Sequence, residues 1–118
     1  MARFRLSLLA RGDVARILTT SAEHWGIEGR RRYAAVIAAG MRKVAAEPDG
    51  PTTKNRAELL GGTRSFHLRH APVGKAEKVR APVHVLYYRT VRPGLIEILR
   101  VLHERMEPSR HIGESPRK

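Results

Sequence analysis

Hydrophobic and polar residues alternate at the start of the chain, over residues 3–9. Alternation with a period of two places successive side chains on opposite faces of a β-strand. The apolar face would carry Phe4, Leu6 and Leu8, and the polar face Arg3, Arg5 and Ser7. We therefore predict a half-buried strand over residues 3–9.

The spacing of apolar residues then lengthens to three or four, which is typical of helices. The first stripe, over residues 10–25, consists of Val14, Ile17, Leu18, Ala22 and Trp25. The second stripe, over residues 27–46, consists of Tyr33, Ile37, Met41 and Val44. Gly26 separates the two stripes and suits a helix end. Because this joint is short, we predict an antiparallel helical hairpin over residues 10–46, with Trp25 packed in its core.

Three more strands are predicted in the second half of the chain. Residues 63–70 alternate again, residues 83–90 are rich in Val, Leu and Tyr, and residues 95–103 form an almost continuous apolar run. Such a run indicates an interior strand that is covered on both faces. The short turn at residues 91–94 joins the last two strands into an antiparallel hairpin. Residues 48–62 and the basic, Pro- and Gly-containing residues 71–82 are predicted loops.

The resulting order of elements is β-α-α-β-β-β. It predicts an α/β (α+β) fold, with an antiparallel-rich four-stranded sheet and the helical hairpin packed on one face. The length of the chain suits one domain, which we assign to residues 1–112, followed by a frayed tail at residues 113–118.

Charge is the strongest compositional signal, because the net charge is +12 and the pI is near 11.4. It predicts an anionic partner, either nucleic acid or an acidic protein. The chain has no cysteine, which excludes disulfides and thiolate chemistry and fits a reducing cytosol. No apolar run approaches the ~20 residues that span a bilayer, and the first residues do not resemble a signal peptide. A cytoplasmic protein without membrane association is expected.

Five segments together resemble a known superfamily. They are FRLS at residues 4–7, His24-Trp25-Gly26, GGTRSFHLRH at 61–70, HVLYYRT at 84–90, and IEILRVLHERMEPSRHI at 96–112. They resemble the RelE/ParE superfamily of bacterial toxins, and most closely its ParE branch. The long basic loop 71–82 departs from this pattern, since many relatives connect the strands more tightly.

The resemblance implies a RelE/ParE-like fold and a cognate antitoxin with an acidic, flexible C-terminal part, as in ParD-like proteins. ParE-like toxins are described as poisons of DNA gyrase, whereas RelE-like relatives cleave mRNA on the ribosome. The favoured interpretation is a non-enzymatic toxin that binds gyrase and is neutralised by its antitoxin. The alternatives are a RelE-like endoribonuclease and a basic nucleic-acid-binding domain.

Metal-independent RNA cleavage would need a base, an acid and cations around the phosphate. The candidate residues are His103, Arg64, Arg89 and Arg105. Glu97 and His103 would lie ~20 Å apart along one strand and cannot form a dyad. Since only one proton-transfer group stands at the expected place, no catalytic residue is favoured.

Partner binding is the preferred role for the polar residues near the strand ends. The residues expected to contact a partner are Arg64, Arg89, Arg100, His103, Arg105, Met106 and Arg110. No metal site or cofactor is predicted, because His67 and His70 are three residues apart on a strand and face opposite sides.

Overall fold

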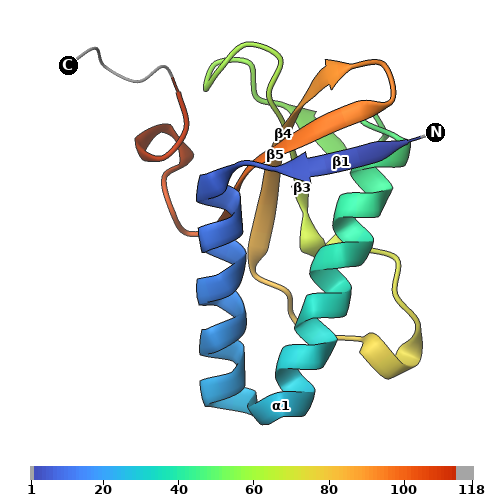
Figure 1. The fold of residues 1–118 in the computed structure, drawn as a ribbon, viewed down its shortest axis with the longest axis vertical. Helices are drawn as coiled ribbons and strands as arrows, with labels where there is room; N and C mark the ends of the chain where they lie inside the picture. The colour runs from blue at the N-terminus through green and yellow to red at the C-terminus, as the bar shows by residue number, and fades with distance from the viewer. Residues whose placement is uncertain (1, 114–118) are drawn as a thin grey trace.

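The computed structural model describes residues 2–113, and within them one five-stranded sheet runs through the molecule in the order β1-β5-β4-β3-β2 (Figure 1). The strands are β1 (Arg3–Leu6), β2 (Thr53–Asn55), β3 (Arg64–His67), β4 (His84–Arg92) and β5 (Leu95–His103). β1 is parallel to β5, and the remaining neighbours are antiparallel. The tail that was predicted to fray lies, from residue 114 onward, outside the described residues.

β5 is an interior strand, as its apolar sequence predicted. β1 pairs with its first half on one side, and β4 pairs with its whole length on the other. Its residues Ile96, Ile98 and Val101 are at most 2% exposed. The prediction of an antiparallel hairpin with β4 is also confirmed.

The prediction of four strands is wrong by one short strand. β2 lies within the predicted loop 48–62 and pairs with β3 at the edge of the sheet. The sequence Thr-Lys-Asn has no apolar alternation, and pairing with β3 fixes its conformation instead. The predicted strand 63–70 ends at His67, because Leu68–His70 turns into a 3₁₀-helix (η1) that buries Leu68.

Helix α1 (Leu8–Ala46) is a hairpin of two arms that lie side by side (Figure 1). Gly26, with φ 74° and ψ −173°, breaks it where the sequence predicted the break. The first arm begins earlier than predicted, because the Ser7 hydroxyl accepts a hydrogen bond from the Ala10 amide and caps it. Leu8 therefore opens the helix and is 85% exposed, whereas the pattern placed it on the apolar face of the first strand.

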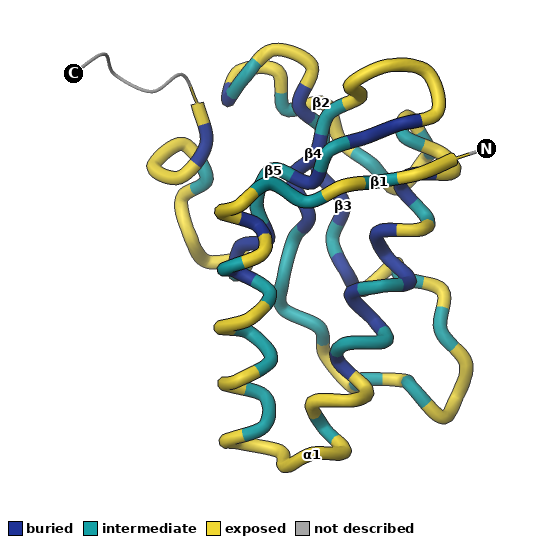
Figure 2. Tube along the Cα trace, viewed as in Figure 1, coloured by how far each residue is buried: buried dark blue, intermediate teal, exposed yellow. Residues whose placement is uncertain are grey.

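The prediction that Trp25 packs inside the hairpin is wrong, since its side chain is 77% exposed. Most buried residues of α1 lie in the second arm, from Tyr33 onward, and Ala10 and Asp13 are buried at the start of the first arm, whereas the tip extends past the sheet (Figure 2). The residues of α1 in this core are Ala10, Tyr33, Val36, Ile37, Met41, Val44 and Ala45.

The opposite face of the sheet carries a smaller apolar cluster. Leu59 and Ile112 cover Tyr87 and Leu102, and Ile112 follows a short 3₁₀-helix, η3 (Pro108–Arg110). The other short 3₁₀-helix, η2 (Lys75–Glu77), lies in the basic loop. No helix in the described part of the chain is both long and apolar enough to cross a bilayer.

Candidate functional site

β5 continues beyond its parallel neighbour, and this leaves part of its edge without a strand partner. The register between β1 and β5 ends at Leu6 and Ile98. The Ser7 amide still donates to the Ile98 carbonyl (3.0 Å), and the Ser7 hydroxyl donates to the Leu99 carbonyl (2.8 Å). From there the first arm of α1 runs beside the edge of residues 99–103.

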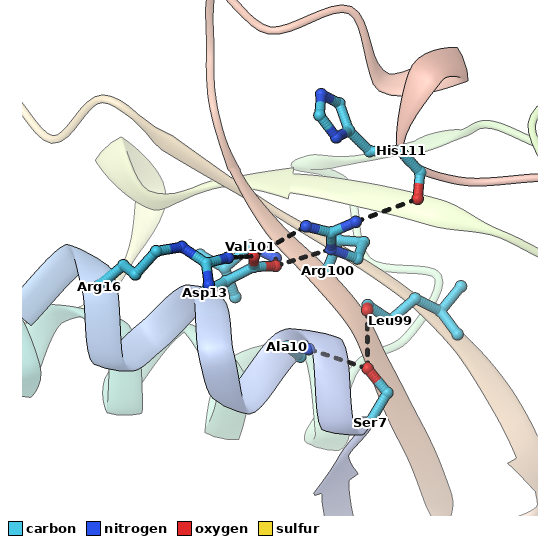
Figure 3. Close-up of polar contacts among 8 residues, drawn as sticks. All are labelled: Ser7, Ala10, Asp13, Arg16, Leu99, Arg100, Val101 and His111. Atoms are coloured by element: carbon cyan, nitrogen blue, oxygen red, sulfur yellow. Dashed lines mark hydrogen bonds and ion pairs between the residues drawn. The ribbon is translucent and has the colours of Figure 1, made fainter.

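Asp13 joins this arm to the β5 edge (Figure 3). Its carboxylate accepts hydrogen bonds from Arg100 Nε and Nη2 (2.8 and 2.9 Å), from the Val101 amide (2.9 Å) and from Arg16 Nη2 (2.7 Å). Burial alone would raise the pKa of Asp13, but the bonds from Arg100 and Val101 and the two guanidinium charges outweigh it and lower the pKa. The carboxylate therefore stays charged and replaces the missing strand partner at Val101.

Arg100 also holds the C-terminal segment, because its Nη1 donates to the His111 carbonyl (3.2 Å). Its side chain is only 13% exposed. The sequence assigned Arg100 to partner binding, on the condition that it is exposed. In the structure its guanidinium is used for internal contacts.

A groove of about 430 Å³ lies between the first arm of α1, the end of β5 and the segment that follows β5. We call it the edge groove. Its lining includes Ile17, Leu102, His103, Met106 and the exposed Arg16. Since Asp13 lies between two arginines, the charge of this region is positive despite the carboxylate.

Two histidines meet at the edge groove. His103 pairs with His84 across the β4–β5 hairpin, and their rings are 5.5 Å apart, edge to face. Tyr33 Oη lies 2.6 Å from His84 Nδ1 and accepts a hydrogen bond from the Val83 amide (3.2 Å). Burial, followed by the charge of His103, lowers the pKa of His84 to about 4, and burial raises the pKa of Tyr33 to about 12. His84 is therefore neutral near pH 7.

Sequence reasoning missed His84. The signal was available, because His84 opens one strand of the hairpin and His103 ends the other. In an antiparallel hairpin with its turn at residues 91–94, positions at about equal distances from the turn pair with each other, and this places His84 near His103. The prediction weighed only Glu97 as a partner for His103, rejected it on distance, and so found no second proton-transfer group.

The other predicted nuclease residues do not gather around His103. Arg64 pairs with Tyr88 in the register of the sheet, four residues from His84, which is about 13 Å along a strand. Its guanidinium contacts Thr53 Oγ1 (2.9 Å) and Asp49 (3.4 Å). Arg89 follows Tyr88 along β4, so its side chain lies on the opposite face of the sheet from those of Tyr88 and Arg64.

The predicted partner-binding residues divide into groups. His103 and Met106 line the edge groove, and Arg105 and Arg110 follow in the same C-terminal segment. Arg64 and Arg89 lie near the other end of the strands. His67 contacts Glu104 (2.6 Å), and residues 2–113 contain no group of three His, Asp or Glu side chains arranged to hold a metal ion.

Comparison with known proteins places the chain in a family. The model of the ParE toxin of the type II toxin–antitoxin system parDE matches residues 4–108. Toxin ParE1 of Caulobacter vibrioides is 32% identical over 115 residues, covering 96% of this chain and all of the relative. Toxin ParE1 of Mycobacterium tuberculosis is 28% identical over 112 residues, covering 93% of this chain and 97% of the relative.

A solved structure shares the fold. It is a chain of the chromosomal ParDE toxin–antitoxin system from P. aeruginosa, with a TM-score of 0.62 and 18% identity, and the match covers 87% of this chain and 96% of that one. The family match spans nearly all the described residues, from β1 to η3. This chain therefore belongs to the ParE toxin family of type II toxin–antitoxin systems.

Proposed function

We propose that this toxin binds and poisons DNA gyrase, and that a cognate ParD-like antitoxin neutralises it by occupying the edge groove. Membership of the ParE family over residues 4–108 carries the proposal. ParE-like toxins are described as gyrase poisons, and a parDE pair implies an antitoxin. The net charge of +12 suits an acidic partner.

The edge groove has the features that a helical antitoxin segment would use. Ile17 and Leu102 offer apolar surface, against which a helical antitoxin segment would lay its own apolar face. Arg16 stands at the rim with a side chain that is 71% exposed. Charge pairs with antitoxin carboxylates would accelerate association, so the association rate should fall as salt rises.

The proposed action is binding rather than catalysis. Arg64 and Arg89 are distant from His103 and face opposite sides of the sheet. The two guanidinium groups that line the edge groove with the histidines, those of Arg16 and Arg100, both contact Asp13. A phosphorane would therefore share these cations with a carboxylate.

One observation supports a second candidate, a RelE-like endoribonuclease. His84 and His103 are adjacent, and two neighbouring imidazoles can act as base and acid in the cleavage of a 2′-hydroxyl phosphodiester. In this mechanism the half-buried His103, which lines the edge groove, would meet the substrate, and Tyr33 would orient His84. The two candidates make different predictions for His103.

The proposal predicts that the purified toxin inhibits DNA supercoiling by gyrase and that the antitoxin encoded beside it restores supercoiling. His103→Ala should inhibit gyrase as the wild type does, because no proton transfer is involved. Gyrase inhibition is measured from plasmid topoisomers separated on agarose. Cleavage of mRNA is measured by primer extension on ribosome-bound mRNA. Cleavage of mRNA that falls ~10²-fold or more in His103→Ala, with gyrase unaffected, would favour the nuclease.

A further inference from the structure

The tip of the α1 hairpin exposes two large apolar side chains that the fold does not use. Trp25 is 77% exposed and Ile27 is 85% exposed, on either side of the break at Gly26. Figure 2 shows this tip as an exposed end of the molecule. A single exposed apolar residue is ordinary, but two together beside a groove indicate a contact surface.

Gly29 allows the two arms to approach closely at the tip. A Cβ atom added at Gly29 would lie 2.2 Å from Trp25 Cβ, so a side chain at position 29 would force the backbone at the tip to shift. The place from which Trp25 projects therefore depends on glycine at position 29.

A groove of about 600 Å³ begins at Trp25 and runs between the second arm and the end of the basic loop. We call it the tip groove. Trp25, Gly29 and Tyr33 line one side, and residues 78–81 and Val83 line the other. The two grooves share Ser21, Trp25 and Val83, whereas Lys78 and Arg80 line the tip groove and not the edge groove.

The loop side of the tip groove is anchored. Arg31 contacts Glu77 (3.5 Å) and donates to the Ala76 carbonyl (3.4 Å), while Val79 packs against the main core. The Val83 amide donates to Tyr33 Oη. The groove is therefore largely preformed, as binding sites usually are.

Charge defines what the tip groove would bind. Lys78 and Arg80 form no ion pair within residues 2–113, and both line the groove. The carboxylate in the lining, Glu28, already contacts Arg31 and Arg32 at 2.6 and 3.3 Å. The groove thus combines an aromatic anchor with unneutralised cations, and tryptophan and arginine are frequent at binding hot spots.

We propose that the tip groove docks the protein target of the toxin, through an acidic segment of the target that places an apolar side chain against Trp25. The proposal rests on the proposed function, in which this target is gyrase. It also gives a role to the basic loop 71–82, whose residues Lys78 and Arg80 line the groove.

Two variants of the full-length toxin test the proposal, Trp25→Ala and the double variant Lys78→Glu/Arg80→Glu. Each should weaken gyrase inhibition at least about 30-fold, the loss expected at a binding hot spot. Because the altered side chains lie at the surface, the urea unfolding midpoint should stay unchanged. The matched controls are Leu8→Ala, an equally exposed apolar residue, and Arg3→Glu/Arg92→Glu, an equal charge change far from the tip.

Antitoxin affinity and growth arrest, measured on the same variants, separate the possible outcomes. Loss of gyrase inhibition in Lys78→Glu/Arg80→Glu, with antitoxin affinity retained, supports the proposal. Full inhibition by both variants overturns it, and so does an equal loss of antitoxin affinity, which would make the tip groove an antitoxin site. If the wild type leaves gyrase active, the gyrase assignment fails. In that case, growth arrest that is lost in both Trp25→Ala and Lys78→Glu/Arg80→Glu would still support docking of a target at the tip groove. Growth arrest that is kept in both variants would refute docking at the tip groove.

Discussion

Asp13 connects three parts of the molecule that are distant in sequence. It binds Arg100 and the Val101 amide of β5, and Arg100 in turn holds the His111 carbonyl (Figure 3). Exposed ion pairs contribute little to stability, but Asp13 is only 4% exposed and its partner Arg100 is largely buried. Removing one member of such a pair leaves the other charge buried without compensation.

Asp13→Asn should therefore lower the free energy of unfolding by about 3 kcal/mol or more. The amide cannot balance two guanidinium charges, and its nitrogen cannot accept the hydrogen bond from Arg100 or Val101. Urea unfolding at pH 7 measures the loss. The matched control is Asp49→Asn, whose carboxylate contacts Arg64 but is 85% exposed, and it should change stability by less than about 1 kcal/mol.

His84 should make the fold sensitive to mild acid. Its pKa in the folded chain is about 4, below the 6.5 of an unperturbed histidine, so the unfolded chain binds its proton first. The stability that neutral His84 provides is complete above pH 6.5 and is lost as the pH falls towards 4. In His84→Gln, urea midpoints measured between pH 7 and pH 4.5 should fall less steeply than in the wild type. Equal slopes would show that His84 titrates normally. Asp13 contributes to the acid sensitivity at lower pH than His84. Its pKa is lowered in the folded chain, so the stability that its charged carboxylate provides is lost as the pH falls below 3.8.

At the scale of elements, the break at Gly26 determines the shape of the helical hairpin. Its φ of 74° and ψ of −173° lie in a region that is almost restricted to glycine. A Cβ atom there would meet nothing within 4 Å, so the cost of a side chain is one of backbone conformation alone.

Gly26→Ala should destabilise the protein by about 1–3 kcal/mol. Thermal or urea unfolding measures this change. Gly61→Ala is the control, since Gly61 also has open space around it but does not have a positive φ. The control should be neutral or slightly stabilising, and a similar loss in both variants would contradict the conformational explanation.

Periodicity predicted the elements with long, regular patterns and failed where tertiary contacts decide. It identified β5 as interior and Gly26 as the break in the hairpin. It missed β2, whose three residues become a strand only by pairing with β3. It also assigned Trp25 to the core, because helical spacing identifies a stripe of apolar residues but does not show where the sheet beneath it ends.

The candidate sites were less predictable than the fold, for a related reason. Arg100 lies in an apolar run, and its partner Asp13 is 87 residues away, so only the packing of α1 on β5 brings the two together. The His84–His103 pair could be deduced from the hairpin register. The tip groove could not, because its side formed by residues 78–83 depends on a loop with no regular pattern.

At the scale of the whole molecule, the basic residues are spread along the chain, and two grooves that share Ser21, Trp25 and Val83 each combine cations with apolar surface. The edge groove offers apolar surface beside the exposed Arg16, and the tip groove offers an aromatic anchor with Lys78 and Arg80. Lys78 and Arg80 line the tip groove and not the edge groove, so under the proposal the two grooves provide one surface for the target and another for the antitoxin. This arrangement supports a toxin that acts by binding.

The central claim, that the toxin poisons gyrase, is tested most directly by trapped DNA cleavage. Purified toxin, gyrase, ATP and supercoiled plasmid are incubated together. The reaction is stopped with detergent, the proteins are digested with protease, and the amount of linear plasmid is measured. We predict that linear plasmid accumulates with toxin concentration and disappears when the toxin is first bound to its antitoxin. Linear plasmid that stays at the level of gyrase alone, while the same toxin cleaves mRNA on ribosomes, would contradict the claim.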